Sequence, residues 1–286
     1  MVKLIKISSI QMFFLILLIS IASADFRLDK VVVTISDINE EGAAHVQESL
    51  YFFVVGDYSR SLYDSGLYNN DLSFWATSTQ ITDMRFHINP NKVDLRDFRV
   101  RPQQLKKCNA FTNSCRGEII LDYIVYPSYK VKNQIGPLVN NTGLFIISKY
   151  KPRTSSFRIN PEALSFAKGD FGDVIISKET SLRIILPKGN VVTELNPVPD
   201  GIEVTLPQVI EELTWTDTIL VRFSLVFDVE ESLDKEVAEF FTDLFKNAQL
   251  VLYGEHGIAT LALVVVLVGS YIYLKSIQHK SNTKSS

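Results

Sequence analysis

The chain has 286 residues, 46% of them hydrophobic, and a formal net charge of −3. Five lysines and one glutamate lie outside residues 25–254, so the middle of the chain carries about −7. A region of that sign without a long basic run argues against nucleic acid or an anionic lipid face as the partner.

The N-terminal 24 residues have the pattern of a secretory signal. Lys3 and Lys6 precede an apolar run at residues 12–19, and Ala22, Ser23 and Ala24 follow it. A basic start, an apolar middle and small residues at the end predict a signal peptide over residues 1–24. An uncut segment would be a second membrane anchor. Either outcome places the following residues outside the cytoplasm.

Residues 25–230 have the composition of strands. A β-branched run at residues 31–35, a turn at residues 40–42 and a second run at residues 44–55 predict a hairpin. Further strands are predicted at residues 84–88, 98–101, 118–126, 144–150, 156–159, 174–177, 182–186, 191–195, 202–206 and 218–229. Long amphipathic helices do not alternate with these strands, which disfavours a parallel α/β sheet.

The predicted fold class is therefore mainly β, with one or two antiparallel β-sandwich units. A polar stretch at residues 149–156 suggests a boundary between a first domain, residues 25–150, and a second domain, residues 151–230. The alternative is one large sandwich in which this stretch is an ordinary loop.

Cys108 and Cys115 are the only cysteines. An even number at short spacing, outside the cytoplasm, predicts a disulfide that closes the tip of a long hairpin. Two thiols at this spacing lack the further ligands that zinc requires, which disfavours a metal or redox role.

Asp37, Asn39, Glu41 and Glu48 nearly match the spacing of a calcium-binding EF-hand loop, with Gly42 at the turn position. An EF-hand needs a helix on each side, whereas this loop lies between two predicted strands. A plain hairpin turn is the preferred interpretation, with calcium as the alternative.

Catalytic patterns are not recognised in the sequence. His45 and His87 are the only histidines between the two apolar ends, and each is predicted as an ordinary strand residue. No cofactor is predicted. Asn140 begins an Asn-Asn-Thr triplet, a candidate glycosylation acceptor on the non-cytoplasmic side.

An amphipathic helix is predicted over residues 231–253, next to the membrane. Its apolar positions recur every three or four residues and form an interaction stripe: Leu233, Val237, Phe240, Phe241, Leu244 and Phe245. The stripe can pack on the second β unit, on another membrane subunit or on a second copy of the chain. Binding to lipid is disfavoured because acids outnumber lysines on this helix.

Residues 255–274 are apolar and predict a single transmembrane helix, followed by a basic cytoplasmic tail at residues 275–286. The predicted location is the plasma membrane, crossed once, with residues 25–253 outside and the C-terminus in the cytoplasm. In a eukaryote it would be the endoplasmic reticulum membrane, with those residues in the lumen.

The layout is similar to that of membrane-anchored β-sandwich proteins of prokaryotes, particularly archaea. The residues that carry this resemblance are Val46-Gln-Glu48-Ser-Leu50 after a glycine turn, and Leu186-Pro187-Lys-Gly189 before a late Trp215. The chain also distantly resembles the tandem sandwiches of ribophorin-type accessory subunits. The resemblance implies an accessory or scaffold role and identifies no catalytic residue.

Two function classes stay open. The first is a membrane-anchored binding or scaffold protein that recruits a protein or glycan partner at the outer membrane face. The second is an anchored hydrolase that acts on surface glycans or peptides through acids brought together by the fold. A pocket lined by two or more acids would favour the hydrolase, and an exposed apolar surface would favour binding.

Overall fold

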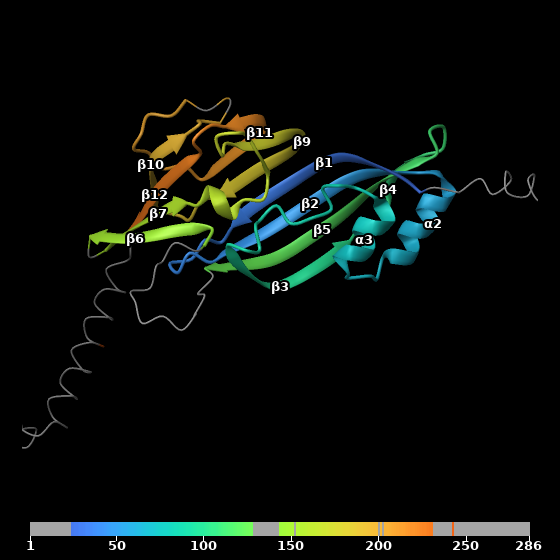
Figure 1. Ribbon diagram of the computed structural model, residues 1–286, viewed down its shortest axis with the longest axis horizontal. Coiled ribbons are helices and arrows are strands. Elements are labelled where there is room, and N and C mark those ends of the chain that lie inside the picture. The colour runs from blue at the N-terminus through green and yellow to red at the C-terminus, as the bar shows by residue number, and fades with distance from the viewer. Residues whose placement is uncertain are drawn as a thin grey trace, which may run out of the picture. The chain divides into compact units, whose positions relative to one another are not determined.

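The computed structural model describes residues 24–127, 143–151, 153–199, 201, 203–230 and 242. The residues up to Glu230 form one compact unit, made mainly of strands (Figure 1). The mainly β class predicted from the sequence is confirmed.

The predicted signal peptide, the transmembrane segment and the tail lie outside the described residues, as does the juxtamembrane helix apart from the helical residue Thr242. Within the described part of the chain, no helix has the length and apolar composition needed to cross a membrane.

The larger of two sheets has eight strands. β11, β9, β1, β2, β5 and β3 follow one another across it, while β4 pairs with β5 and β8 with β9. The bounds are β1 Asp25–Ser36, β2 Ala44–Val55, β3 Val93–Pro102, β4 Lys106–Asn109, β5 Ser114–Pro127, β8 Ala167–Lys168, β9 Val174–Ile185 and β11 Glu212–Leu220.

The smaller sheet has four strands in the order β10, β12, β7 and β6. Their bounds are β6 Phe145–Lys151, β7 Thr154–Ile159, β10 Asn190–Asn196 and β12 Ser224–Glu230. A short 3-10 helix, η1, spans Pro161–Ala163.

The predicted N-terminal hairpin is confirmed as β1 and β2. Val31, Val33 and Ile35 are fully buried and alternate with less buried residues, as expected for a strand with one face on the core. Gly42 in the turn has φ +79°, and an added Cβ would lie 3.0 Å from the side chain of Ile147. The turn therefore packs so closely on β6 that it needs glycine.

One strand pairing differs from the antiparallel arrangement that the sequence predicts. β1 and β9 run parallel, with Val33 opposite Leu182. Parallel neighbours need a long connection. Here the connection between β1 and β9 contains β2 to β8. Strands on both sides of residue 150 thus belong to the larger sheet, and the predicted boundary there does not separate the two sheets.

Three predicted strands also differ from the structure. Residues 84–88 form a loop with a single β-bridge between Ile88 and Leu164, and residues 203–206 are not in a strand. The run at residues 218–229 is divided between β11 and β12 by a turn at Val221 and Arg222. A β-branched composition alone does not reveal these interruptions.

Two helices that the sequence analysis missed lie at one end of the larger sheet, α2 (Gly56–Gly66) and α3 (Leu72–Thr79) (Figure 1). The buried face of α2 is Ser59, Tyr63 and Gly66, which have helical spacing but form no apolar stripe. An added Cβ on Gly66 would lie 2.7 Å from the Trp75 ring, so glycine permits the two helices to approach.

Tyr63 attaches α2 to the sheet. Its ring packs between Phe52 of β2 and Trp75 of α3, with ring centres 5.8 and 5.3 Å away. Its single hydroxyl proton is shared between the carbonyl oxygens of Gln103, 2.6 Å from the hydroxyl oxygen, and Glu118, 3.0 Å from it. This ring therefore fills the junction between both helices and the larger sheet.

The two sheets share one hydrophobic core, which includes residues of β1, β2, β5, β9 and β11 together with those of the smaller sheet. On the smaller sheet, the rings of Phe157 and Phe227 stack with centres 5.1 Å apart, and Phe145 meets Phe227 edge-on at 5.8 Å. Aromatic pairs of this kind add about 0.5–1.5 kcal/mol each beyond the apolar area that they bury.

Burial of Tyr63 predicts a loss of stability in alkali. Burial raises the pKa of its phenol from 10.0 to about 12. The pKa of Tyr63 is higher in the folded protein than in the unfolded chain. The contribution of the neutral phenol to the unfolding free energy is therefore complete below pH 10 and is lost as the pH rises toward 12. We expect the unfolding free energy to fall over this window by about 2 kcal/mol more than in Tyr63→Phe. Urea titrations at several pH values measure the difference, and identical pH slopes would contradict it.

Candidate functional site

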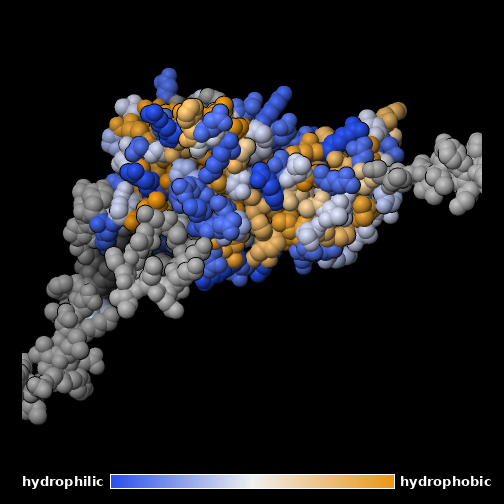
Figure 2. All heavy atoms as spheres, viewed as in Figure 1, coloured by the Kyte–Doolittle hydropathy of each residue, from blue (hydrophilic) through white to orange (hydrophobic). Residues whose placement is uncertain are grey.

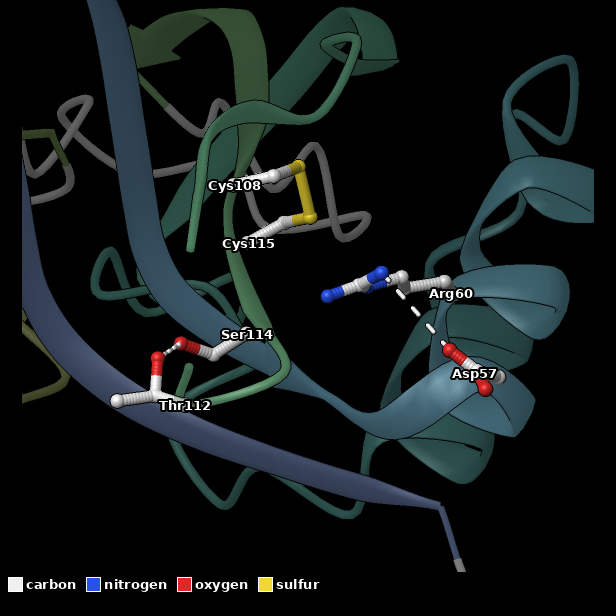
Figure 3. Close-up of a disulfide and its surroundings, with 6 residues drawn as sticks. All are labelled: Asp57, Arg60, Cys108, Thr112, Ser114 and Cys115. Carbon is white, nitrogen blue, oxygen red and sulfur yellow. Dashed lines mark hydrogen bonds and ion pairs between the residues drawn. A yellow bond between two sulfur atoms is a disulfide. The ribbon is translucent and has the colours of Figure 1, made fainter. Parts of the chain in front are cut away.

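The hairpin tip between β4 and β5, here called the finger (residues 106–116), is closed by a disulfide. Cys108 and Cys115 are bonded, with Cα atoms 4.0 Å apart (Figure 3), which confirms the pairing predicted from the sequence. Residues 106–113 are all exposed, whereas Cys115 is buried. The disulfide therefore joins an exposed segment to a strand that belongs to the core.

Side-chain hydrogen bonds fix the turn of the finger. The Asn109 side-chain oxygen accepts from the amides of Phe111 at 2.8 Å and Thr112 at 3.4 Å. The amide of Gly56 donates to the carbonyl of Asn113 at 2.8 Å, which ties the turn to the start of α2. Such Asx turns hold the backbone in one conformation, so the residue at the tip is presented in a defined direction.

The residue at the tip is Phe111, whose relative exposure is 102%. The turn projects at the end of the unit that carries α2 and α3 (Figure 1), and its outermost point is hydrophobic (Figure 2). Tyr58 of α2 and Tyr68 after it are also exposed. Single exposed apolar residues are common, but here an aromatic ring is exposed on a segment that a disulfide and three hydrogen bonds hold in place.

The finger is positively charged, in contrast to the acidic unit around it. It contains Lys106, Lys107 and Arg116 and no acidic residue. Lys106 lies 3.6 Å from Glu118, and Arg116 lies 3.6 Å from Asp29. Both pairs are long, and their basic side chains are exposed although the acids are half-buried, so they leave part of the positive charge available to a partner.

Arg60 of α2 lies close to this region. Figure 3 shows its side chain extending from the helix toward the strand that carries Cys115. Its guanidinium lies 3.8 Å from Asp57, and its buried Nε has no hydrogen-bond partner. Arg60 is therefore a further positive group on the helix whose first residue is hydrogen-bonded to the turn of the finger.

A second polar cluster lies inside the core, between β2, β5 and the loop after α3. Glu48 is fully buried and its carboxylate accepts three hydrogen bonds. The His87 amide donates to Oε1 at 2.9 Å, the His87 ring Nδ1 lies 2.8 Å from Oε2, and the Tyr123 hydroxyl donates to Oε1. Burial and the neighbouring Glu48 raise the pKa of Tyr123 well above its usual value of 10.0.

This cluster is closed to solvent, so we assign it a structural role. His87 has a relative exposure of 1%, and its ring packs 5.2 Å from that of Phe166. The sequence predicts that His87 is an ordinary strand residue, whereas it lies in a loop and binds a carboxylate 39 positions away. No local motif signals a pair so far apart in the sequence.

The four residues with calcium-loop spacing are not brought together. Glu48 is opposite Val33 in the hairpin, three residue pairs from the end pair of Ser36 and His45, or about 10 Å along the strand. The Asn39 side chain instead accepts from the amides of Glu41 and Ala43 within the turn. Asp37 and Glu41 are exposed, while Glu48 faces the core.

A hollow of about 290 Å³ lies beside β11. Its lining is Val198, Thr214, Trp215, Thr216 and Thr218. None of these side chains is acidic or basic, so this hollow offers no general acid or base.

Several predicted site residues lie outside the described residues. They are the glycosylation candidate Asn140 and the stripe residues Leu233, Val237, Phe240, Phe241, Leu244 and Phe245. Their roles stay predictions.

Comparisons with known proteins identify no family. No family model and no curated protein matches the chain. Among solved structures, native leukotriene A4 hydrolase from Saccharomyces cerevisiae is similar over 72% of this chain and 29% of its own, with 9% identity and a TM-score of 0.28. The folded domain of LppM from Mycobacterium tuberculosis is similar over 73% of this chain and 91% of its own, with 10% identity and a TM-score of 0.19. The chain thus spans less than a third of the yeast hydrolase.

Replacing Glu48 tests the structural role of the buried cluster. Glu48→Leu leaves three donors without an acceptor, and we expect the unfolding free energy to fall by about 3 kcal/mol or more. Glu48→Gln should lower it less, because the amide can donate to His87 Nδ1 once the ring proton moves to Nε2. Urea unfolding of the full-length variants measures both effects.

Glu41→Leu is the matched control, since Glu41 is exposed in the turn of the same hairpin. It should change the unfolding free energy by less than about 0.5 kcal/mol. Equal effects of Glu41→Leu and Glu48→Leu would show that the buried cluster contributes nothing.

Proposed function

We propose that this protein is a membrane-anchored, extracytoplasmic binding or scaffold protein, an accessory subunit that recruits a protein or glycan partner at the outer membrane face. The apolar segments at residues 1–24 and 255–274 support the location. The disulfide also supports it, because such bonds persist in oxidising compartments.

The observation that carries the proposal is the rigid presentation of Phe111. Burying a phenylalanine side chain against a partner stabilises a complex by about 1.5–3 kcal/mol. A disulfide-closed turn loses little conformational freedom on binding, so more of that free energy remains as affinity. An aromatic anchor surrounded by polar residues is also the usual arrangement of binding hot spots.

The charge of the finger favours one kind of partner. Lys106, Lys107 and Arg116 lie on either side of the aromatic tip. A protein surface with an apolar pocket and an acidic rim matches this pattern, because opposite charges steer the encounter and fix its orientation. A glycan that stacks on the ring is the alternative partner.

The hydrolase alternative has less support. The hollow beside β11 is lined by threonine, valine and tryptophan, and the acid of the buried cluster, Glu48, is sealed from solvent. Neither place offers a substrate the pair of accessible acids that glycoside hydrolysis requires.

Phe111→Ser tests the proposed function. We expect it to abolish copurification of the partner from gently solubilised membranes, since it removes the anchor. The melting temperature should stay within about 1 °C, because an exposed side chain contributes little to folding. Quantitative mass spectrometry of the copurified proteins and a thermal scan give the two readouts.

Phe171→Ser is the matched control, because Phe171 is also fully exposed in a turn, with a relative exposure of 95%. It should leave the set of copurified proteins unchanged. Undiminished copurification with Phe111→Ser would contradict the assignment of the finger as the binding site.

A further inference from the structure

The larger sheet has two edges that are protected to different degrees. β3 and β11 are the outermost strands, and among the described strands each has a neighbour on one side only. Unpaired backbone groups on an edge strand can bind another chain, and natural proteins prevent this with charges and bulges. The two edges therefore show which side of the sheet is open to pairing.

β3 has the protected pattern. It carries a bulge between Arg96 and Arg99 and five charged residues among its ten: Asp94, Arg96, Asp97, Arg99 and Arg101. Arg96 lies 2.8 Å from Asp94, and Arg101 pairs with Asp122 of β5. An incoming strand would have to displace or bury these charges.

β11 lacks this protection over its first half. The Glu212 carboxylate lies 2.6 Å from the guanidinium of Arg183 on β9. The next charged residue along β11 is Asp217, which lies at the bulge and has φ +49°. The four residues between them, 213–216, are uncharged and pair with β9 in regular register. Among the described strands, none pairs with the other side of this neutral stretch.

The hollow lies against this same stretch. Trp215, Thr214 and Thr216 line it, with Val198 from the segment after β10. The indole of Trp215 donates to the Pro197 carbonyl at 3.0 Å and packs 5.2 Å from the Phe223 ring, which fixes the wall. At about 290 Å³ the hollow has room for a large aliphatic side chain.

We propose that the edge of β11 binds an extended segment of a partner protein as an added antiparallel or parallel strand, with one apolar side chain of that segment in the hollow. Backbone hydrogen bonds would supply affinity and the hollow would supply specificity, as in other cases of strand addition. Glu212 is already paired with Arg183, but Glu211 and Asp217 place an exposed acid at each end of the neutral stretch, so the segment is basic at its ends. This site is independent of the finger.

The test uses the full-length protein and a fluorescent peptide, Lys-Val-Thr-Leu-Thr-Val-Lys, blocked at both termini. Anisotropy titration should show saturable binding. Two further peptides carry N-methyl groups on alternate backbone nitrogens, one on each of the two alternating sets. Methylation removes amide donors without changing the charge, so these peptides distinguish backbone pairing from charge attraction. One of them should bind at least about tenfold more weakly, because it loses the amide donors that face β11.

Thr216→Lys should also weaken binding of the unmethylated peptide at least about tenfold. It places on this edge the kind of charge that protects β3, and it repels the basic peptide. Thr77→Lys is the matched control, since it adds the same charge to an exposed position of α3, and it should leave affinity unchanged.

Three outcomes would overturn the proposal. The first is the absence of saturable binding up to about 1 mM peptide. The second is equal binding of all three peptides. The third, by sedimentation, is a dimer that Thr216→Lys dissociates, which would show that a second copy of the chain occupies the edge. Because Phe111 is not involved, Phe111→Ser should bind the peptide like the unmodified protein, so failure here leaves the proposed function standing.

Discussion

The structure depends on satisfying one buried carboxylate. Glu48 lies in the centre of β2, with no exposed surface. Leaving a carboxyl group in an apolar core without hydrogen bonds costs several kcal/mol, a large part of the net stability of a domain. Tyr123 of β5 and both donors of His87 meet this requirement. The loop after α3 must therefore lie across the sheet, and not extend into solvent.

The position of this loop organises the segments beyond it. The His87 carbonyl accepts from the Ser165 amide at 2.7 Å, and the Asn89 amide donates to the Ala163 carbonyl at the same distance. The bridge between Ile88 and Leu164 lies between these bonds. Segments from the two halves of the chain are thus joined over the larger sheet. With that framework fixed, its surface can carry a rigid finger and an open strand edge as separate binding elements.

The sequence patterns predicted the features that are formed by residues close together in the chain. The alternation in residues 31–55 and a turn with glycine sufficed for the first hairpin, and two cysteines outside the cytoplasm sufficed for the disulfide. α2 was missed because its buried face is Ser59, Tyr63 and Gly66, a combination without an apolar stripe. The parallel pairing of β1 with β9 and the bond between Glu48 and His87 join residues distant in sequence, and no residue pattern encodes either partner. The sequence does not reveal which strands lie at the edges of the sheet. The lack of charge on β11 can therefore be interpreted only when the strand order is known.

Hydrogen exchange of the His87 amide tests the central claim most directly. This amide lies in a loop, where exchange through local opening is normally fast. If its bond to buried Glu48 holds the loop to the sheet, it should exchange only through global unfolding, with the same protection as amides of β2 and β5. Protection no greater than that of exposed loop amides, such as those of Asp170 and Phe171, would contradict the account.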